Sequence, residues 1–254
     1  MKREIRDFVS EGIVRVTIAD ERWYFRENKD KTRTEVPSVT WIAGCYPKGV
    51  QFYKWLAQKG WDESEAIKTS AGDKGSKVHN AIEDLLKGDT VKMDSKYINN
   101  STGQPEELTI DEYSCLMNFV DWHNETKPKT LRTEFVIFDD IDGYAGTVDY
   151  LCQIGDEVWL IDFKTGQSVW TEYELQISAY RKALERQGVK IDKMATLQVG
   201  YKLNKRGWKL TELEDKYPLF LHAKAIWQEE HGGEKPKIVN YPDKLKVGNP
   251  EIKK

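Results

Sequence analysis

The sequence predicts an α/β fold with a mixed central sheet. Its middle third holds three apolar segments of strand length separated by short turns, which predicts an antiparallel meander. These segments cover 131–138, 144–154 and 158–164. A helical segment from Thr171 to about Gln187 follows, and an apolar segment at 194–203 would return as a further strand after this crossover. A helix that ends at Lys87 precedes the meander, so the order of the core elements is αβββαβ.

Periodicity and capping residues justify the two core helices. The helix that ends at Lys87 has apolar residues on one face, at the spacing of a core-facing helix. They are Val78, Ala81, Ile82, Leu85 and Leu86. We expect Thr171 to cap the second helix, and Gly188 stands just past its end.

The flanking segments contribute further elements. Alternation and helical periodicity predict a strand pair around 13–25, a helix at 50–59, an edge strand at 208–213 and a closing helix at 217–230. From about Gly232 the chain is charged and rich in Pro and Gly, which predicts an extended tail over 233–254.

Composition indicates a water-soluble protein. The chain has 254 residues, of which 39% are hydrophobic, and no long apolar run, so it can bury a sizeable core but has no candidate membrane span. Residues 1–10 are charged and lack the apolar segment of a signal peptide, so we expect a cytoplasmic protein that does not bind membranes. The net charge of −3 does not by itself indicate a nucleic-acid partner.

Two carboxylates and a lysine stand on adjacent strands of the expected meander. Asp162 and Lys164 end a strand that is apolar on both faces, and side chains two residues apart share a face. Asp149 ends the preceding apolar segment. A buried carboxylate is costly unless it is paired or binds a cation, so this group suggests a divalent metal and a reacting phosphate. An ordinary ion pair at a strand end remains the alternative for Asp162 and Lys164.

The second core helix places a glutamine where an apolar residue is expected. Gln176 belongs to the stripe that continues with Ala179, Tyr180 and Ala183, and Tyr180 lies one turn later on the same face. A buried amide needs hydrogen-bond partners, which a neighbouring metal site would offer. A core glutamine satisfied elsewhere is equally compatible with the helix alone.

The order of these residues resembles the RecB-type branch of the PD-(D/E)xK nuclease superfamily. That branch carries GxxD, DxK and QxxxY blocks and an upstream histidine. They match Gly146 to Asp149, Asp162 to Lys164, Gln176 to Tyr180, and His79. Pro37 to Thr40, Trp55 and Gly75 to His79 also resemble the front half of phage exonucleases and of the mitochondrial genome maintenance exonuclease.

The resemblance implies a restriction-endonuclease-like core with helical amino-terminal additions. It implies one nuclease domain over 1–232, with an amino-terminal cover at 1–88 that contains the His79 helix, a variable insertion at 89–112 and a catalytic core at 127–213. It implies hydrolysis of DNA with Mg²⁺ or Mn²⁺. Several members hold an iron-sulfur cluster on four cysteines. This chain has three, Cys45, Cys115 and Cys152, without a CxxC pair, so we expect reduced packing residues and no cluster.

Roles for individual residues follow from the resemblance. The metal ligands would be His79, Asp149, Asp162 and the carbonyl of Phe163, while Lys164 would orient the attacking water. Outside this set, Glu134 would reach the site through a water or a second ion. Gln176 and Tyr180 would hold the loop after Lys164 and contact the DNA backbone. A structural histidine remains the alternative for His79.

The chain carries candidates for gripping DNA. Nine tryptophans are present, and bases of a single strand stack on aromatic rings beside basic groups. Trp170 is the best stacking candidate because it follows the Lys164 loop, and Lys74 and Lys77 are basic residues on the His79 helix. The segment 37–61 could arch over the site and admit a single strand.

We therefore expect an exonuclease acting on single-stranded or frayed DNA ends in phage or related replication, recombination or repair, in the host cytoplasm if phage-encoded. Replication or recombination proteins are the expected protein partners. Two alternatives remain: a catalytically silent DNA-binding or assembly module of the same fold, and a hydrolase of another phosphoester.

Overall fold

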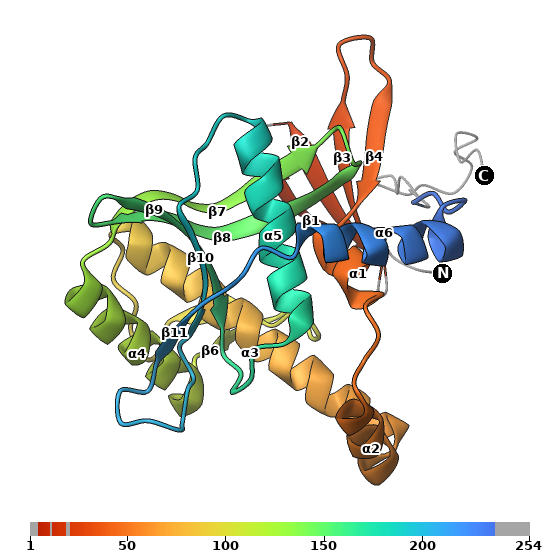
Figure 1. Ribbon diagram of the computed structural model, residues 1–254. Helices are drawn as coiled ribbons and strands as arrows, with labels where there is room; N and C mark the ends of the chain where they lie inside the picture. Colours follow the sequence, from red (N-terminus) through yellow and green to blue (C-terminus); the bar gives the residue numbers. More distant parts are fainter. Residues whose placement is uncertain (1–4, 11, 19–20, 237–254) are drawn as a thin grey trace, which may run out of the picture.

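A five-stranded mixed sheet forms the centre of the computed structural model, which describes residues 5–10, 12–18 and 21–236 (Figure 1). Its strands lie in the order β11-β10-β9-β8-β7. They are β7 (Lys129–Asp139), β8 (Tyr144–Ile154), β9 (Glu157–Lys164), β10 (Lys193–Gln198) and β11 (Lys209–Glu212). β10 pairs with β9 in parallel and the other neighbours pair antiparallel, so the sheet is mixed as predicted.

The meander and the crossover follow from local sequence. Gly143 and Gly155 adopt left-handed φ angles of 64° and 60°, which glycine tolerates without strain, and each lies in a turn between two strands. Helix α5 (Thr171–Arg186) connects β9 to β10, as a parallel pair requires. With α3 (Trp61–Lys87) before the meander, the αβββαβ order is confirmed.

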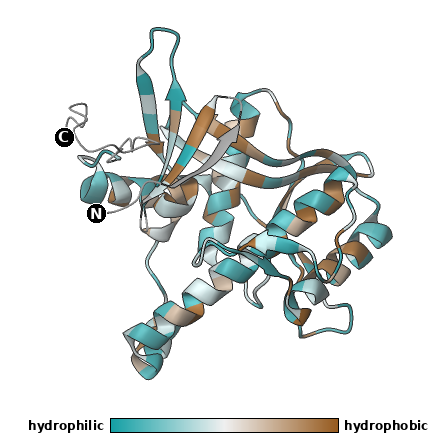
Figure 2. Cartoon of the chain, turned by 180° about the vertical axis from the view of Figure 1, so that it is seen from behind, coloured by the Kyte–Doolittle hydropathy of each residue, from teal (hydrophilic) through white to brown (hydrophobic). Residues whose placement is uncertain are grey.

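Helices cover both faces of the sheet, so the core has two halves. On one side α5 packs with α1 (Val39–Gly44) and α6 (Tyr217–His231) in a cluster that includes Val148 and Leu160. On the other side α3 and α4 (Ile110–Thr126) pack in a cluster that includes Tyr150 and Ile161. Figure 2 shows hydrophobic residues along the strands of this sheet, whereas the tip of the β3–β4 hairpin is hydrophilic.

The amino-terminal region is richer in strands than the sequence indicated. In place of a strand pair around 13–25 followed only by helices, it forms a four-stranded antiparallel sheet. The strands are β1 (Ile5–Ser10), β2 (Ile13–Ile18), β3 (Glu21–Glu27) and β4 (Arg33–Pro37). Ser38 forms a parallel bridge to Ala145 in the part of β8 that β9 does not reach, which attaches this second sheet to the first.

Two helices were not expected from the sequence. α4 begins with a capping box, in which the Thr109 side chain accepts from Glu112 N–H and the Glu112 side chain accepts from Thr109 N–H. This pattern was present in the sequence at the end of the segment assigned to an insertion. The other helix, α1, begins where the Ser38 hydroxyl accepts the N–H of Trp41. The insertion itself contains a small hairpin of β5 (Lys96–Ile98) and β6 (Pro105–Glu107).

Several boundaries differ from the predictions. Thr171 is the first helical residue of α5 rather than its cap, and the cap position, Trp170, makes no capping hydrogen bond through its side chain. β10 ends at Gln198 instead of continuing to 203. A Cβ atom on Gly200 would lie 2.4 Å from the carbonyl oxygen of Thr165, so the backbone there passes too close for a strand with side chains on both faces.

The segment 37–61 does not form the expected arch. α1 packs on α5 and α6, whereas α2 (Val50–Lys59) packs on α3 and has no buried residue. α2 lies beside the start of α3 and projects away from the body of the protein (Figure 1). Trp61, the first residue of α3, precedes His79 by 18 residues, which is about 27 Å along a helix axis.

None of the helices among the described residues is long and apolar enough to cross a membrane. Of the expected tail, residues 233–236 are described without regular structure, and 237–254 lie outside the described residues.

A buried ion pair fixes the β7–β8 turn against α5. Asp139 is 3% exposed, and its Oδ1 accepts the backbone N–H groups of Ile141 and Asp142 at 3.0 and 2.8 Å. Arg186 Nη1 donates to both carboxylate oxygens of Asp139, at 2.7 and 2.6 Å, and its Nη2 lies 2.7 Å from Asp142 Oδ2. Losing the arginine would leave a buried carboxylate without its counter-charge.

We expect Arg186→Met to lower the free energy of unfolding by about 3 kcal/mol, measured by urea denaturation, because it uncovers the Asp139 charge. Arg181→Met is the control on the same helix. Arg181 makes a more exposed pair with Glu185, so its loss should cost no more than about 0.5 kcal/mol. Equal losses in the two variants would contradict the assigned role of Asp139.

Candidate active site

Side chains alternate between the two faces of a regular strand, and this alternation is interrupted at Glu134 in β7 and Asp149 in β8. In a regular strand, Val148 and Tyr150 would face the same side, yet they belong to the two opposite core clusters. The register pairs Thr133 with Tyr150 and Phe135 with Val148, and Glu134 between them has a left-handed φ of 44°. A glutamate in this conformation is uncommon. The break lets Glu134 and Asp149 point toward α3 instead of into a packed core.

His79 on α3 faces both carboxylates. Its Nδ1 lies 3.5 Å from Asp149 Oδ2 and 3.8 Å from Glu134 Oε1, while its Nε2 lies 3.0 Å from the carbonyl oxygen of Phe163. A carbonyl can only accept, so Nε2 carries the proton in the neutral ring and Nδ1 presents its lone pair to the carboxylates. Fixing the tautomer of a histidine in this way is how proteins orient a metal ligand.

These three residues fit a divalent cation. One ligand atom from each of His79, Glu134 and Asp149 lies within 4.8 Å of the others. Burial raises the pKa of Glu134 well above its usual value, and the charges of Asp149 and Glu83 raise it further. A cation bound between the carboxylates would offset this repulsion, and oxygen and imidazole ligands suit Mg²⁺ or Mn²⁺.

A second group lies beside the first, at the end of β9. Asp162 is 3% exposed, and its Oδ2 lies 2.6 Å from Lys164 Nζ. Gln176 Nε2 on α5 donates to Asp162 Oδ1 at 3.0 Å and to the Tyr180 hydroxyl at 3.2 Å. The ammonium of Lys164 also lies 4.4 Å from the ring centre of Tyr173, a contact that the sequence did not suggest.

Mutual electrostatics couple the charges of this second group. Burial raises the pKa of Asp162 to about 6, since the opposing effect of Lys164 is only partial and the charge of Asp149 adds to the rise. Burial disfavours the Lys164 charge, but Asp162 and Asp149 outweigh it and raise the lysine pKa. Lys164 therefore keeps its positive charge at neutral pH.

Phe163 connects the two groups through its backbone. Its N–H donates to Asp149 Oδ2 at 2.8 Å, and its carbonyl accepts from His79 Nε2. The peptide groups between Asp162 and Lys164 thus fix the carboxylate of Asp149 and the ring of His79. Both the expected metal ligands and the expected lysine depend on the position of this one strand end.

The ring of Tyr180 on α5 leaves no room for a side chain at Gly146 in β8. A Cβ atom at position 146 would lie 2.4 Å from Cε1 and 2.9 Å from the hydroxyl of Tyr180, closer than atoms can pack. The glycine of the GxxD block therefore makes room for the tyrosine of the QxxxY block, and Tyr180 lies where Gln176 can reach it.

The expected ligand set and the observed grouping differ. His79 and Asp149 lie together as expected, and Glu134 lies with them. Asp162 lies outside this three-residue group and is held by Lys164 and Gln176. The Phe163 carbonyl is the hydrogen-bond partner of His79.

The loop after Lys164 is held by other residues than Gln176 and Tyr180. Gln198 Nε2 donates to the carbonyl of Gly166 at 3.0 Å, and Gln167 donates to the carbonyl of Gly200. The loop is therefore fixed to β10 and its continuation, not to α5, which corrects the role that the resemblance implied.

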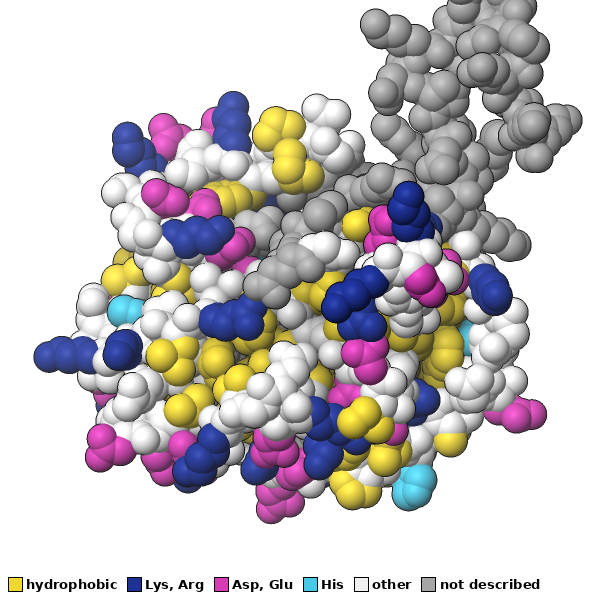
Figure 3. All heavy atoms as spheres, turned by 90° about the horizontal axis from the view of Figure 1, so that it is seen from above, with side chains coloured by type: hydrophobic (Ala, Val, Ile, Leu, Met, Phe, Trp, Pro, Cys, Tyr) yellow, Lys and Arg dark blue, Asp and Glu magenta, His cyan; other side chains and the backbone are white. Residues whose placement is uncertain are grey.

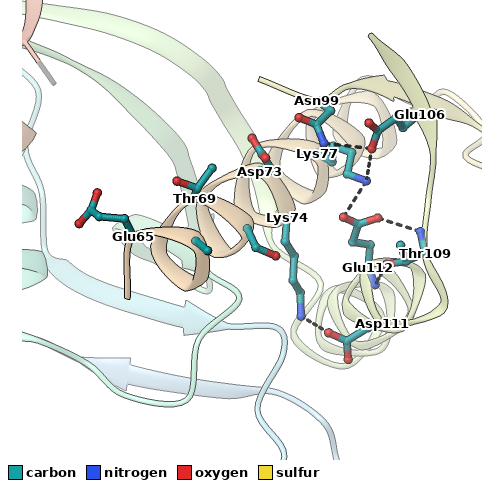
Figure 4. A pocket seen from close by; sticks show the side chains of 12 residues that line it. Glu65, Thr69, Asp73, Lys74, Lys77, Asn99, Glu106, Thr109, Asp111 and Glu112 are labelled. Atoms are coloured by element: carbon teal, nitrogen blue, oxygen red, sulfur yellow. Dashed lines mark hydrogen bonds and ion pairs between the residues drawn. The ribbon is translucent and has the colours of Figure 1, made fainter. Parts of the chain in front are cut away.

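Two of the expected DNA contacts are buried. Lys77 is 4% exposed, and its Nζ lies 2.9 Å from Glu112 and 3.8 Å from Glu106 (Figure 4). Tyr180 is 3% exposed. Neither side chain is placed to contact DNA, because each is enclosed by protein; Tyr180 instead supports Gln176.

The remaining expected contacts are accessible. Trp170 is 56% exposed at the start of α5. Lys74 is paired with Asp111 and lines, with Lys77, a cavity of about 680 Å³ between α3, the β5–β6 hairpin and α4 (Figure 4). On the face shown in Figure 3, Lys and Arg side chains are interspersed with Asp and Glu rather than gathered in one basic patch.

Fold and site together define an α/β protein with a histidine–carboxylate group and an aspartate–lysine pair at adjoining strand positions of a mixed sheet. No protein-family model matches the chain, and no curated protein matches it. A crystal structure of an alkaline exonuclease from Laribacter hongkongensis matches with a TM-score of 0.38 and 11% sequence identity, over 76% of this chain and 84% of that one. A likeness of this size carries no functional weight beside the geometry of the site.

We expect Gly146→Ala to lower the free energy of unfolding by about 1–3 kcal/mol in urea denaturation, because the new methyl group overlaps the ring of Tyr180. Gly72→Ala is the control. Gly72 lies exposed within α3 with open space around it, so alanine should be neutral or raise stability by up to about 1 kcal/mol. Adding Tyr180→Leu to Gly146→Ala should restore part of the loss, and an unchanged loss in the double variant would contradict the clash.

We expect Glu134→Gln to raise the free energy of unfolding of the chelator-treated protein at neutral pH by about 1 kcal/mol. The folded state raises the pKa of Glu134, so its ionised form disfavours folding above that pKa, and a neutral amide removes this cost. The same variant should lose most of any stabilisation by Mn²⁺. Glu157→Gln, on an exposed position of β9, is the control and should change neither quantity. A less stable Gln variant that keeps the full metal effect would show that Glu134 is not in the metal site.

Proposed function

We propose that this protein is a Mg²⁺- or Mn²⁺-dependent deoxyribonuclease. The observation that carries the proposal is the convergence of His79, Glu134 and Asp149 within 4.8 Å beside the buried Asp162–Lys164 pair. Buried carboxylates that repel one another are costly to fold, and a bound cation offsets that cost. The order of the GxxD, DxK and QxxxY blocks supports nuclease chemistry over other phosphoester hydrolysis.

Each side chain has a role in this proposal. His79, Glu134 and Asp149 would hold the cation, and Asp162 would bind a water on that cation or a second ion. When bound, the cation would polarise a phosphate oxygen and lower the pKa of a coordinated water. Lys164, kept charged by Asp162, would stabilise the negative charge that develops on the phosphate and orient the water. Gln176 and Tyr180 position Asp162.

The proposal also covers the form of the DNA substrate, which must have a free end, and the biological setting. We propose an exonuclease for single-stranded or frayed DNA ends, in phage or related replication, recombination or repair, with replication or recombination proteins as partners. Trp170, exposed at the start of α5, would stack on a base. Residues 1–232 would act as one nuclease domain, with the catalytic core at 127–213. The competing candidate is a silent DNA-binding module, and the intact Asp162–Lys164 pair disfavours it.

A digestion assay tests the proposal. The substrates are linear single-stranded and double-stranded DNA labelled at the 5′ or 3′ end, and a circular single strand, each with Mg²⁺, Mn²⁺ or a chelator. We expect metal-dependent release of nucleotides from linear single strands and resistance of the circle. Lys164→Met should reduce the rate about 100-fold or more, as does loss of one donor to a transition-state oxyanion.

Lys190→Met is the matched control, because Lys190 is 85% exposed. It precedes the start of β10, whereas Lys164 pairs with the last residue of that strand. Its rate should equal that of the wild type. Far-ultraviolet circular dichroism of Lys164→Met verifies that the variant is folded. DNA binding without metal-dependent cleavage by the wild type would favour the silent module, and rapid cleavage of the circle would refute the end requirement.

A further inference from the structure

A second group of metal-binding side chains lies away from the candidate active site. It joins Cys45, the residue that ends α1, to Glu230 and His231 in the last turn of α6. One ligand atom from each of the three residues lies within 4.8 Å of the others. Glu230 Oε2 lies 3.9 Å from His231 Nε2. Cys45 was expected to be a packing residue, but it is partly exposed, unlike the buried Cys115 and Cys152.

The ring of His231 is held in one orientation. Its Nδ1 lies 3.2 Å from Glu234 Oε1, so this nitrogen carries the proton and donates to the carboxylate. The ring also packs against Trp41 and Trp227, with centroid distances of 5.0 and 6.0 Å. Nε2 is therefore left with its lone pair on the side of Glu230. A carboxylate on the other nitrogen is the usual partner of a histidine that binds a metal.

We propose that Cys45, Glu230 and His231 bind a Zn²⁺ ion, with Glu234 as the orienting partner of His231. A thiolate, an imidazole and a carboxylate are the ligand types that zinc takes in tetrahedral sites, and a water would fill the fourth position. The thiolate disfavours Mg²⁺ and Ca²⁺, which take oxygen ligands. The site is therefore chemically distinct from the one formed by His79, Glu134 and Asp149.

Charge at the site also favours a cation. Glu230 lies beside the thiol and the imidazole, and Glu234 lies beside the imidazole on its other nitrogen. Among the described side chains, the ion pairs of His231 are with these two glutamates. A zinc ion would replace this repulsion with three coordinate bonds.

The consequence is structural. α1 packs on α5, and α5 carries Gln176 and Tyr180. A zinc ion between the end of α1 and the end of α6 would cross-link two helices that are 185 residues apart in sequence (Cys45 to Glu230) and that cover one face of the sheet. Metal bound only by the folded state contributes its binding free energy to folding.

Cobalt substitution tests the site in the full-length protein. After chelation and removal of the chelator, Co²⁺ is added and the near-ultraviolet charge-transfer absorption of a cobalt thiolate is recorded, followed by displacement with Zn²⁺. We expect this absorption in the wild type at one equivalent per chain, and its loss on adding Zn²⁺. The His79 group has no sulfur and cannot produce it.

Matched variants assign the absorption to residues. Cys45→Ser should abolish it, whereas Cys115→Ser and Cys152→Ser should keep it. Glu234→Gln, an exposed change that should leave the fold intact, should weaken Zn²⁺ affinity about tenfold to a hundredfold, as loss of an outer-shell partner does. Zn²⁺ should raise the melting temperature of the wild type by more than that of Cys45→Ser, which keeps only the His79 group. Absence of the absorption in the wild type, or its persistence in Cys45→Ser, would overturn the proposal.

Discussion

The carboxylate of Asp149 is the point on which the candidate site depends. Its Oδ2 accepts the N–H of Phe163 and faces Nδ1 of His79, so it joins β8, β9 and α3. The same Phe163 peptide chain orients His79 through its carbonyl and continues into Lys164. Because these bonds involve backbone groups at a strand end, the sheet itself positions the side chains of the site. A loop-borne site of the same residues would have to order them on binding.

Placing three carboxylates in this buried site is electrostatically unfavourable, because each is desolvated and they repel one another. Glu134 and Asp162 both have raised pKa values, chiefly because they are buried, and Asp149 adds to both. Lys164 is the close cationic partner of Asp162, and the charge of Arg15 opposes part of the rise at Glu134. Glu134 is also held in a left-handed backbone conformation that its residue type disfavours. Strain and repulsion concentrated at one place, in an otherwise well-paired sheet, are what a preformed cation site requires.

The two proposed metal sites offer different sets of ligand atoms. The His79 group offers oxygen and nitrogen at the centre of the sheet, between the two helical layers. The Cys45 group offers sulfur, nitrogen and oxygen at the edge of the α1–α5–α6 layer. Zinc and magnesium differ in their preference for sulfur over oxygen, so each ion has a site that suits it better than the other. The first site would serve chemistry, and the second would stabilise the layer that supports it.

The sequence alone determined the mixed sheet, the αβββαβ order and the position of Asp162 and Lys164 on one face at the end of a strand, because alternation, turn glycines and helical periodicity are local properties. It also marked α4 through Thr109 and Glu112, although that cap was assigned to an insertion. Tertiary structure decided what depends on residues distant in sequence. The break at Glu134 depends on how β7 pairs with β8. Lys77 is buried by Glu112, 35 residues later, and Gly146 contacts Tyr180, 34 residues later. Local patterns carry no information on such distances, so the close grouping of Glu134 with His79 and Asp149, and the separate position of Asp162, are decided by the packed fold.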